Sequence, residues 1–328
     1  MKKVNSFSKC MILGMAAAAS LIALSAPAAA QQVTISDSTN SYKAGIGPNG
    51  ELYDSNTKIG FRNPAGQDYI LPGTPRDSWG ITGSTGSAFA DYQDYGTLGI
   101  SSTLITPGLN SATAVSSLMN GIALTQVYNF FAPNILSIQE TVTNTTGADI
   151  DNVIFRRNVD FDVPPTAFNE NVFGVLGANA SVVGNSYYGF ENPNPSSPFG
   201  YQCGTSCNQT GDLGVGIDLG LGTLTAGSSK TFAYYYGINQ PGQNLNDLFS
   251  QAQGLGLNYL IGAQSSENGA YPGLGSGAAF LGVSSVGTIA GAVPEPATWA
   301  MMILGVGAVG FAMRRSRKAK VNTTVSFA

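Results

Sequence analysis

The sequence contains no histidine, and this absence limits the chemistry that its residues can perform. Catalytic arrangements that pair a nucleophile with an imidazole, such as Ser-His-Asp and Cys-His, are excluded within this sequence. Sites that bind zinc, copper or non-haem iron through histidine are excluded in the same way. The remaining possibilities are carboxylate chemistry, such as a glycosidase pair, or calcium coordination by oxygen ligands.

Basic residues are scarce in the central part of the chain. Of fifteen Lys and Arg residues, three lie at or before Lys9 and five at or after Arg314, which leaves seven between them. All nineteen Asp and Glu residues lie between Asp37 and Glu295, so that segment carries a formal charge of 7 − 19 = −12. Because nucleic-acid binding requires a basic patch, we expect no nucleic-acid partner.

Cysteine is also rare, with three residues in all. Cys10 lies near the N-terminus, whereas Cys203 and Cys207 form the pattern Cys-Gly-Thr-Ser-Cys. In an oxidising compartment this close pair predicts a small disulfide. The alternative is a redox or metal pair, but a metal site would require further Cys or His ligands. We therefore expect no metal and no cofactor.

The N-terminus has the pattern of a secretory signal peptide. Lysines at positions 2, 3 and 9 precede an apolar run, Met11 to Leu24, and Ala28-Ala29-Ala30 supplies small residues for cleavage before Gln31. This pattern predicts a signal peptide over residues 1–30, removed by signal peptidase, and therefore an exported protein.

The C-terminus has three parts in a fixed order. Pro294-Glu295-Pro296 is followed by Trp299 and an uncharged apolar run that ends at Met313. A basic cluster comes next, formed by Arg314, Arg315, Arg317 and Lys318. The apolar run predicts a single transmembrane helix, and the basic cluster places the residues after it in the cytoplasm. A plain single-pass anchor is the alternative interpretation of the run and the cluster.

The order of motif, aromatic residue, apolar run and basic cluster resembles the PEP-CTERM sorting signal of Gram-negative bacteria. The resemblance implies that residues 294–320 are read by an exosortase, a membrane-embedded cysteine peptidase, with cleavage near the Pro-Glu-Pro motif. It implies transient anchoring in the inner membrane and then delivery to the cell surface or the extracellular polysaccharide. Residues 321–328 would form a cytoplasmic tail.

Residues 31–286 are predicted to form one extracellular domain, a mainly β, antiparallel β-sandwich, followed by a flexible linker at 287–293. Alternating residues at 138–142 and 153–163 flank the turn Asn144-Thr145-Thr146-Gly147, which predicts a hairpin or a Greek-key neighbour pair. Further strands are expected at Gln32–Ser36, Leu118–Phe131, Phe173–Leu176, Val215–Leu219, Thr231–Gly237 and Ala278–Val286. One short amphipathic helix is expected at Leu245–Gln253, where Asn244 caps together with Asp247.

Polar residues on one predicted strand form a candidate ligand face. Asn158, Asp160 and Asp162 alternate along it, and could bind Ca²⁺ or an oligosaccharide. The alternative is a solvated strand face on which Arg156 pairs with a carboxylate. On the apolar face, Arg157 must lie at a rim or form an ion pair, for which the candidate partners are Asp149, Asp151 and Glu140.

Aromatic residues are a second candidate. They could stack on sugar rings, although alternating aromatics in β proteins more often pack in the core. The residues concerned are Trp79, Tyr92, Tyr95, Tyr187, Tyr188, Tyr201, Tyr234, Tyr235 and Tyr236.

These patterns together predict a non-enzymatic structural or adhesive component of the cell surface, or of the exopolysaccharide matrix of a biofilm. Exopolysaccharide is the expected partner. A carbohydrate-binding module is the first alternative and predicts coplanar aromatics on an exposed face. A carboxylate glycosidase is the second, and predicts two carboxyl groups about 5 to 9 Å apart across a cleft.

Overall fold

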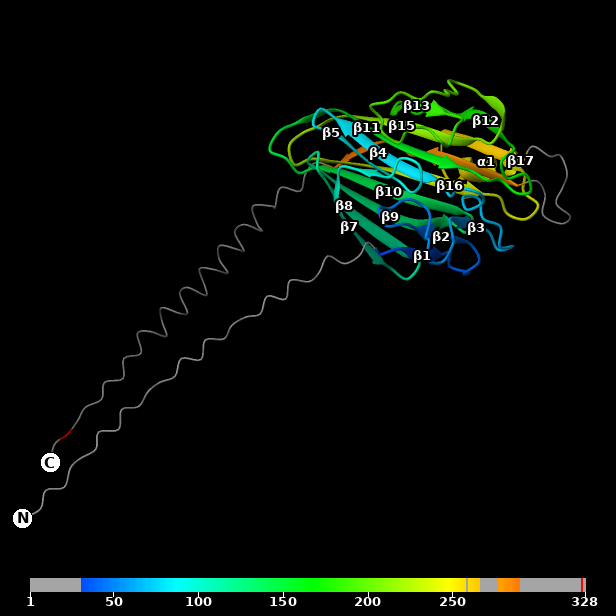
Figure 1. Cartoon of the computed structure of the whole chain (residues 1–328), viewed down its shortest axis with the longest axis horizontal. Helices are drawn as coiled ribbons and strands as arrows, with labels where there is room; N and C mark the ends of the chain where they lie inside the picture. Colours follow the sequence, from blue (N-terminus) through cyan, green and yellow to red (C-terminus); the bar gives the residue numbers. More distant parts are fainter. Residues whose placement is uncertain (1–30, 258, 266–276, 290–325, 327–328) are drawn as a thin grey trace, which may run out of the picture.

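The computed structural model describes residues 31–257, 259–265, 277–289 and 326. The described residues form three antiparallel sheets and one helix (Figure 1). The predicted mainly β, antiparallel architecture with one short helix is therefore confirmed. The signal peptide and the sorting signal lie outside the described residues. Within those residues, no helix has the length and apolar character needed to cross a membrane.

The largest sheet has ten strands, in the order β14-β12-β17-β18-β16-β10-β9-β8-β7, and β19 also pairs with β16. Its strands are β7 (Ile100–Pro107), β8 (Ser111–Leu118), β9 (Ile122–Ala132), β10 (Ile135–Asn144), β12 (Glu170–Leu176), β14 (Asn208–Gly211), β16 (Ser229–Ile238), β17 (Tyr259–Ser265), β18 (Ala278–Val283) and β19 (Gly287–Ile289). The sequence predicted a linker from residue 287, but β19 pairs with Ser229–Thr231, so the body of the protein extends at least to residue 289.

The two other sheets are smaller. The six-stranded sheet has the order β13-β15-β11-β4-β5-β6 and the three-stranded sheet the order β1-β2-β3. Their strands are β1 (Val33–Ser36), β2 (Lys43–Ile46), β3 (Phe61–Arg62), β4 (Asp77–Gly83), β5 (Gly86–Asp91), β6 (Thr97–Leu98), β11 (Ile150–Asp160), β13 (Val182–Ser186) and β15 (Gly214–Leu224). The predicted strands are recovered with shifted ends. The strands that were not predicted are β2, β3, β4, β5, β6, β7, β8, β13, β14, β17 and β19. In β4, β5, β7 and β8, Ser, Thr, Gly and Ala occupy many of the positions and weaken the strand pattern.

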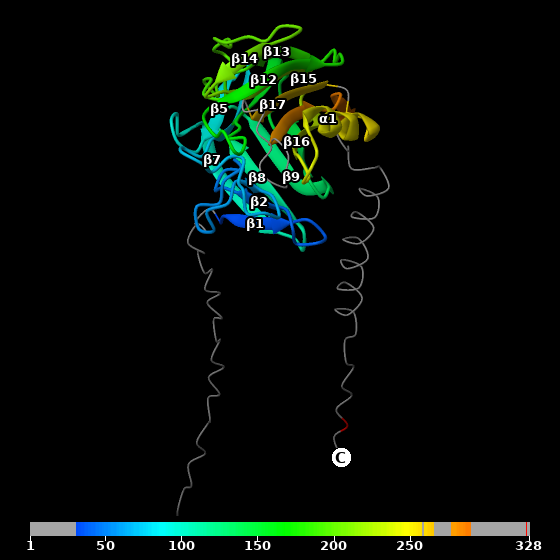
Figure 2. The ribbon, with the colours of Figure 1, turned by 90° about the vertical axis from the view of Figure 1, so that its right-hand side faces the viewer.

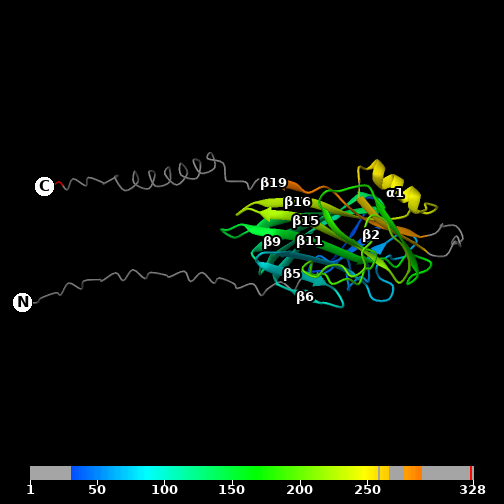
Figure 3. The same ribbon diagram turned by 90° about the horizontal axis from the view of Figure 1, so that it is seen from above.

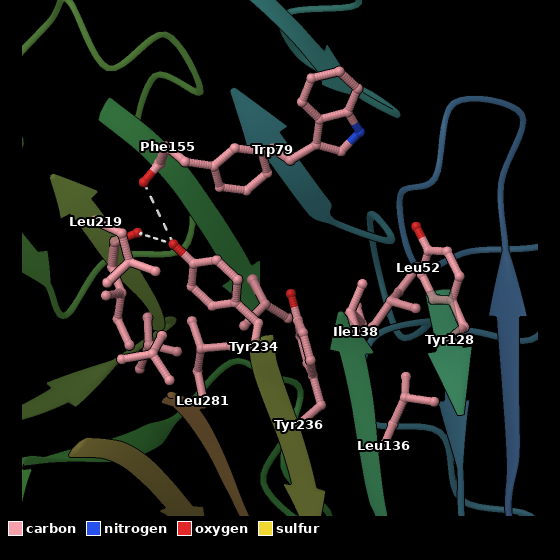
Figure 4. Packing of buried hydrophobic residues seen from close by; sticks show 14 of the residues in the cluster. Leu52, Trp79, Tyr128, Leu136, Ile138, Phe155, Leu219, Tyr234, Tyr236 and Leu281 are labelled. Atoms are coloured by element: carbon pink, nitrogen blue, oxygen red, sulfur yellow. Dashed lines mark hydrogen bonds between the residues drawn. The ribbon is translucent and has the colours of Figure 1, made fainter. Parts of the chain in front are cut away.

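The six-stranded sheet packs against the ten-stranded sheet through aromatic side chains (Figure 4). The ring of Phe155 on β11 lies 5.3 Å from Phe232 and 5.9 Å from Tyr234 on β16, measured between centroids. The buried Tyr234 hydroxyl donates to the Ile217 carbonyl oxygen across the interface, at 3.0 Å. Because side chains alternate along a strand, Tyr234 and Tyr236 point into this core and Tyr235 points out.

The prediction that residues 138–142 and 153–163 form a hairpin or a Greek-key neighbour pair is wrong. Strand β10 pairs with β9 and β16, whereas β11 pairs with β4 and β15, so the two strands lie in different sheets. Asn144 holds the connection by donating to the carbonyl oxygens of Ala148 and Leu224, at 2.8 and 2.9 Å. The alternating pattern located both strands, but pairing partners are set by distant segments that the local pattern does not contain.

The predicted helix is confirmed as α1 (Leu245–Gly254). The Asn244 side chain accepts from the Asp247 backbone N–H and the Asp247 side chain accepts from that of Asn244, which is the expected capping box. The apolar face of the helix packs with Leu260 and Phe280 of β17 and β18. The helix therefore lies on the outside of the ten-stranded sheet, over its β16–β18 part (Figures 2 and 3).

Arg157 forms a buried ion pair at the centre of the interface between the sheets. Its guanidinium group lies 2.6 Å from Asp77 on β4 and 3.1 Å from Glu140 on β10. It also donates to the Tyr236 hydroxyl at 2.7 Å and to the Gly50 carbonyl oxygen at 3.1 Å. The predicted pairing with Glu140 is confirmed. Pairing of Arg157 with Asp149 or Asp151 is not observed. The Asp149 carboxylate accepts a hydrogen bond from the Ala226 N–H, and the Asp151 carboxylate accepts one from the Thr223 hydroxyl.

We expect the substitution Arg157→Met to lower the free energy of unfolding by about 3–5 kcal/mol, because it leaves the Asp77 carboxylate buried without its cation. Urea denaturation followed by tryptophan fluorescence would measure this loss. The control is Arg62→Met, which breaks a partly exposed pair with Asp68 at 3.4 Å and should cost about 1 kcal/mol or less. Equal losses in the two variants would contradict a central role for Arg157.

Candidate functional site

The candidate ligand face on β11 is not exposed. Asn158, Asp160 and Asp162 are each at most 3% exposed. Asp162 lies just beyond the end of β11. Asn158 and Asp160 are covered because residues 187–201 cross the outside of the six-stranded sheet, where the Asn158 amide donates to the Glu191 carbonyl oxygen at 3.2 Å and Gly189 lies against Asp160. The same segment covers Arg156, which pairs with Asp218 at 2.7 Å below the ring of Phe199. The predicted pairing of Arg156 with a carboxylate is confirmed, but the strand face is buried and not solvated.

Asp160 and Asp162 lie near Glu170 in a buried acidic group. Burial, together with the neighbouring charges of Asp160 and Glu170, raises the pKa of Asp162 to about 10. Burial likewise raises the pKa of Glu170 to about 8 and that of Asp160 well above its usual range. These carboxyl groups are therefore largely neutral at pH 7. In the part of the chain that the structure describes, no three Asp, Glu or Cys side chains are arranged to hold a metal ion.

The aromatic candidates do not form a flat platform. Trp79, Tyr234 and Tyr236 are buried in the core. Tyr201, 49% exposed, forms a surface cluster with Tyr187, Tyr188 and Phe190. The contacting rings in this cluster are tilted by 44–71° from one another. They pack against each other and do not present the coplanar row that a carbohydrate-binding module was expected to show.

A different surface has the character of a binding site, namely the outer face of the ten-stranded sheet. Along four neighbouring strands, side chains that point to this face alternate with side chains that point into the core. None of the side chains on the outer face is charged. We define the outer face by these residues: Thr113, Val115 and Ser117 of β8; Thr125, Val127, Asn129 and Phe131 of β9; Ser137, Gln139, Thr141 and Thr143 of β10; and Ser229, Thr231 and Tyr235 of β16.

The strand register arranges these hydroxyl groups in rows across the sheet. Thr125 on β9 is opposite Thr141 on β10, which is opposite Thr231 on β16. The Thr141 and Thr231 hydroxyl oxygens lie 3.2 Å apart, and those of Thr143 and Ser229 lie 2.8 Å apart in the next row. The outer face therefore presents ordered hydroxyl groups whose spacing is fixed by the backbone.

Two aromatic rings lie at one end of the outer face. Phe131, 47% exposed, lies 5.4 Å from Tyr235 with the ring planes tilted by 60°. Beside them is a hollow of about 540 Å³, lined by residues that include Gln139, Thr231 and Ser285. Tyr235 also packs against the apolar cluster that includes the buried residues of helix α1.

The outer face suits a ligand that is uncharged and rich in hydroxyl groups. Threonine and serine hydroxyls both donate and accept hydrogen bonds, and the Gln139 and Asn129 amides add further donors and acceptors. Aromatic rings provide apolar surface for the C–H faces of such a ligand. Among the residues of this face, Tyr235 was predicted from the sequence as a candidate ligand contact and the others were not. For the residues on β8, on β9 and at the start of β10, the signal that could have found them is the run from Tyr95 to Gln139, which contains no charged residue.

Comparison with known proteins identifies the C-terminal segment. Residues 292–318 match the model of the PEP-CTERM protein-sorting motif. The chain carries a PEP-CTERM sorting signal. No curated protein matches the chain.

The match to the PEP-CTERM motif confirms the resemblance found in the sequence. It covers the Pro294-Glu295-Pro296 motif, Trp299 and the basic residues Arg314 to Lys318. The motif implies export, processing by an exosortase and membrane-associated sorting toward the cell surface. The predicted disulfide is consistent with export, and the structure shows it between Cys203 and Cys207, with Cα atoms 4.8 Å apart.

We expect Glu295→Ala to block processing at the C-terminal sorting signal, because it removes the central residue of the motif. Intact-mass measurement of the protein in its own host should find a chain shortened at both ends for the wild type. The variant should keep its C-terminal segment and stay in the membrane fraction. Asp247→Ala, which lies outside the motif, is the control. A wild-type chain that keeps its C-terminal segment would contradict exosortase processing.

We also expect stability to fall as the pH rises. Burial raises the pKa of Glu51 and of Glu140 to about 7 and that of Glu170 to about 8, so the folded state binds more protons than the unfolded state above about pH 4.5. The free energy of unfolding is therefore highest at acidic pH. The part of it that comes from these three glutamates is lost progressively between about pH 4.5 and 8. Urea denaturation at pH 5 and pH 8 should show the higher midpoint at pH 5.

The variant Glu170→Gln tests the cause of this pH dependence. A neutral amide cannot titrate, so the difference between the two midpoints should shrink. Asp149→Asn, at an exposed carboxylate, should leave the difference unchanged. A midpoint that rises from pH 5 to pH 8 in the wild type would contradict the assignment.

Proposed function

We propose that the exported body binds a neutral polysaccharide through the outer face of the ten-stranded sheet, and acts as an adhesive or structural component of the cell surface or extracellular matrix. The observation that carries this proposal is an outer face with rows of uncharged hydroxyl groups and with Phe131 and Tyr235 at one end. The PEP-CTERM motif supports it, because the motif directs the protein to the compartment where such polymers are found.

The dimensions of the outer face suit an extended polymer. Neighbouring strands are roughly 4.8 Å apart, so the four strands that form this face present a surface roughly 15–20 Å wide. A surface of this width can contact several sugar units at once. Because the hydroxyl groups belong to paired strands, they are already ordered before the polymer binds, which lowers the entropy cost of binding.

The charge distribution favours a neutral polymer over an anionic one. The segment from Asp37 to Glu295 has a formal charge of −12, and it stays negative when Asp160, Asp162 and Glu170 are neutral, which opposes the approach of an anionic chain. No basic residue belongs to the outer face to offset this repulsion. A neutral polysaccharide meets no such barrier there.

A non-catalytic role agrees with the state of the acidic groups. A glycosidase needs one ionised carboxylate and one protonated carboxylic acid on either side of the scissile bond. The raised pKa values of Asp160, Asp162 and Glu170 leave these groups largely neutral at pH 7, and the side chains are buried. The outer face itself contains hydroxyl, amide and apolar side chains and no carboxyl group.

Affinity electrophoresis of the processed protein in gels that contain polysaccharide tests this proposal. The polymers are the exopolysaccharide of its own host, a neutral glucan and anionic alginate. We expect retardation by the host polymer when it is neutral, and none by alginate. Tyr235→Ala should weaken binding about fivefold to tenfold, because it removes an aromatic contact.

The matched control is Tyr201→Ala, which removes a half-exposed tyrosine from the surface cluster on another part of the molecule. Its binding should equal that of the wild type. If Tyr201→Ala weakens binding and Tyr235→Ala does not, the site lies at the tyrosine cluster and not on the outer face. Absence of retardation by every neutral polymer would overturn the proposal.

A further inference from the structure

We propose that strand β7 is the surface through which two copies of this chain associate, pairing edge to edge and antiparallel. Strand β7 is the last strand of the ten-stranded sheet, and its partner among the described strands is β8. The backbone N–H and C=O groups on its other side have no strand partner in the described part of the chain. Such an edge is a template for another strand.

Strand β7 lacks the features that usually protect an edge. Proteins block exposed edges with charged side chains, internal prolines, bulges or very short strands. Strand β7 has eight residues and no charge, its proline is the terminal Pro107, and its irregularity lies at the other end, between Ile100 and Ser102. The stretch from Ser102 to Thr106 is therefore open, and Leu104 at its centre is 60% exposed.

The other edges fit a partner strand less well. The opposite edge of the same sheet is β14, which has four residues and is followed at once by Asp212. The edges of the six-stranded sheet are β6, with two residues, and β13, with five. The edge that matches the length of β7 is β7 itself, and self-pairing about a two-fold axis satisfies both copies equally.

The charge distribution also favours a second copy at this edge. Two copies that each carry a net negative charge repel one another over most approaches. Strand β7 lies within the charge-free run from Tyr95 to Gln139, so this repulsion is smallest where the two β7 strands meet. Pairing would also join the two outer faces, because Ser102, Leu104 and Thr106 are opposite Ser117, Val115 and Thr113 of β8.

Sedimentation equilibrium of the processed protein, recovered from its own host and without polysaccharide, tests this proposal. We expect a concentration-dependent dimer. Leu104→Lys and Leu104→Glu should each weaken association about tenfold, because like charges would face each other across the new strand pair. Gln209→Lys, an exposed substitution on the opposite edge strand β14, should change it less than about twofold.

An equimolar mixture of the Leu104→Lys and Leu104→Glu proteins provides the decisive measurement. Opposite charges would then face each other, and association should return to at least the wild-type level. A wild-type protein that stays monomeric, an equal effect of Gln209→Lys, or failure of the mixture to associate would each overturn the proposal. Because no polysaccharide is present, these outcomes are independent of ligand binding by the outer face.

Discussion

The structure depends on one buried cation, the guanidinium group of Arg157. It reaches β4 through Asp77, β10 through Glu140, β16 through Tyr236 and the N-terminal segment through the Gly50 carbonyl oxygen. A guanidinium group has five N–H donors in a fixed plane, so it can satisfy several acceptors from different segments at once. Removing it would leave those acceptors buried without a partner, which ties the register of both large sheets to a single side chain.

The packing of the sheets determines which of their faces remain exposed and can bind a partner. The inner faces of both large sheets are used by the core, and residues 187–201 cover the outside of the six-stranded sheet at Arg156 and Asn158. Helix α1 covers the β16–β18 part of the ten-stranded sheet. The outer face over β8, β9, β10 and the exposed part of β16 is left, together with the edge at β7. The candidate site is therefore where the fold leaves ordered strands uncovered.

The sequence predicted the features that local chemistry determines. The capping box at Asn244 and the disulfide at Cys203 and Cys207 depend on neighbours within a few residues, and both are present. The sequence did not predict which strands pair with one another, because no residue near β10 or β11 indicates that these two strands belong to different sheets. The outer face was missed because alternation of Ser and Thr with small apolar residues gives a weak periodic signal. The burial of Asp160 was not predicted either, because it depends on residues 187–201, which are distant in the sequence.

The distribution of charge links the core to the proposed roles of the surface. Three of the seven basic residues between Asp37 and Glu295, namely Arg76, Arg156 and Arg157, are fully buried and paired with carboxylates. Each of these arginines is neutralised by a carboxylate inside the protein, so it adds no positive charge to the surface, and the net negative charge of the segment opposes contact with anions and with other copies of the chain. An uncharged sheet face and an uncharged edge are then the places where contact costs least. The arginines that hold the sheets together are thus not available to bind anions at the surface, which favours neutral partners.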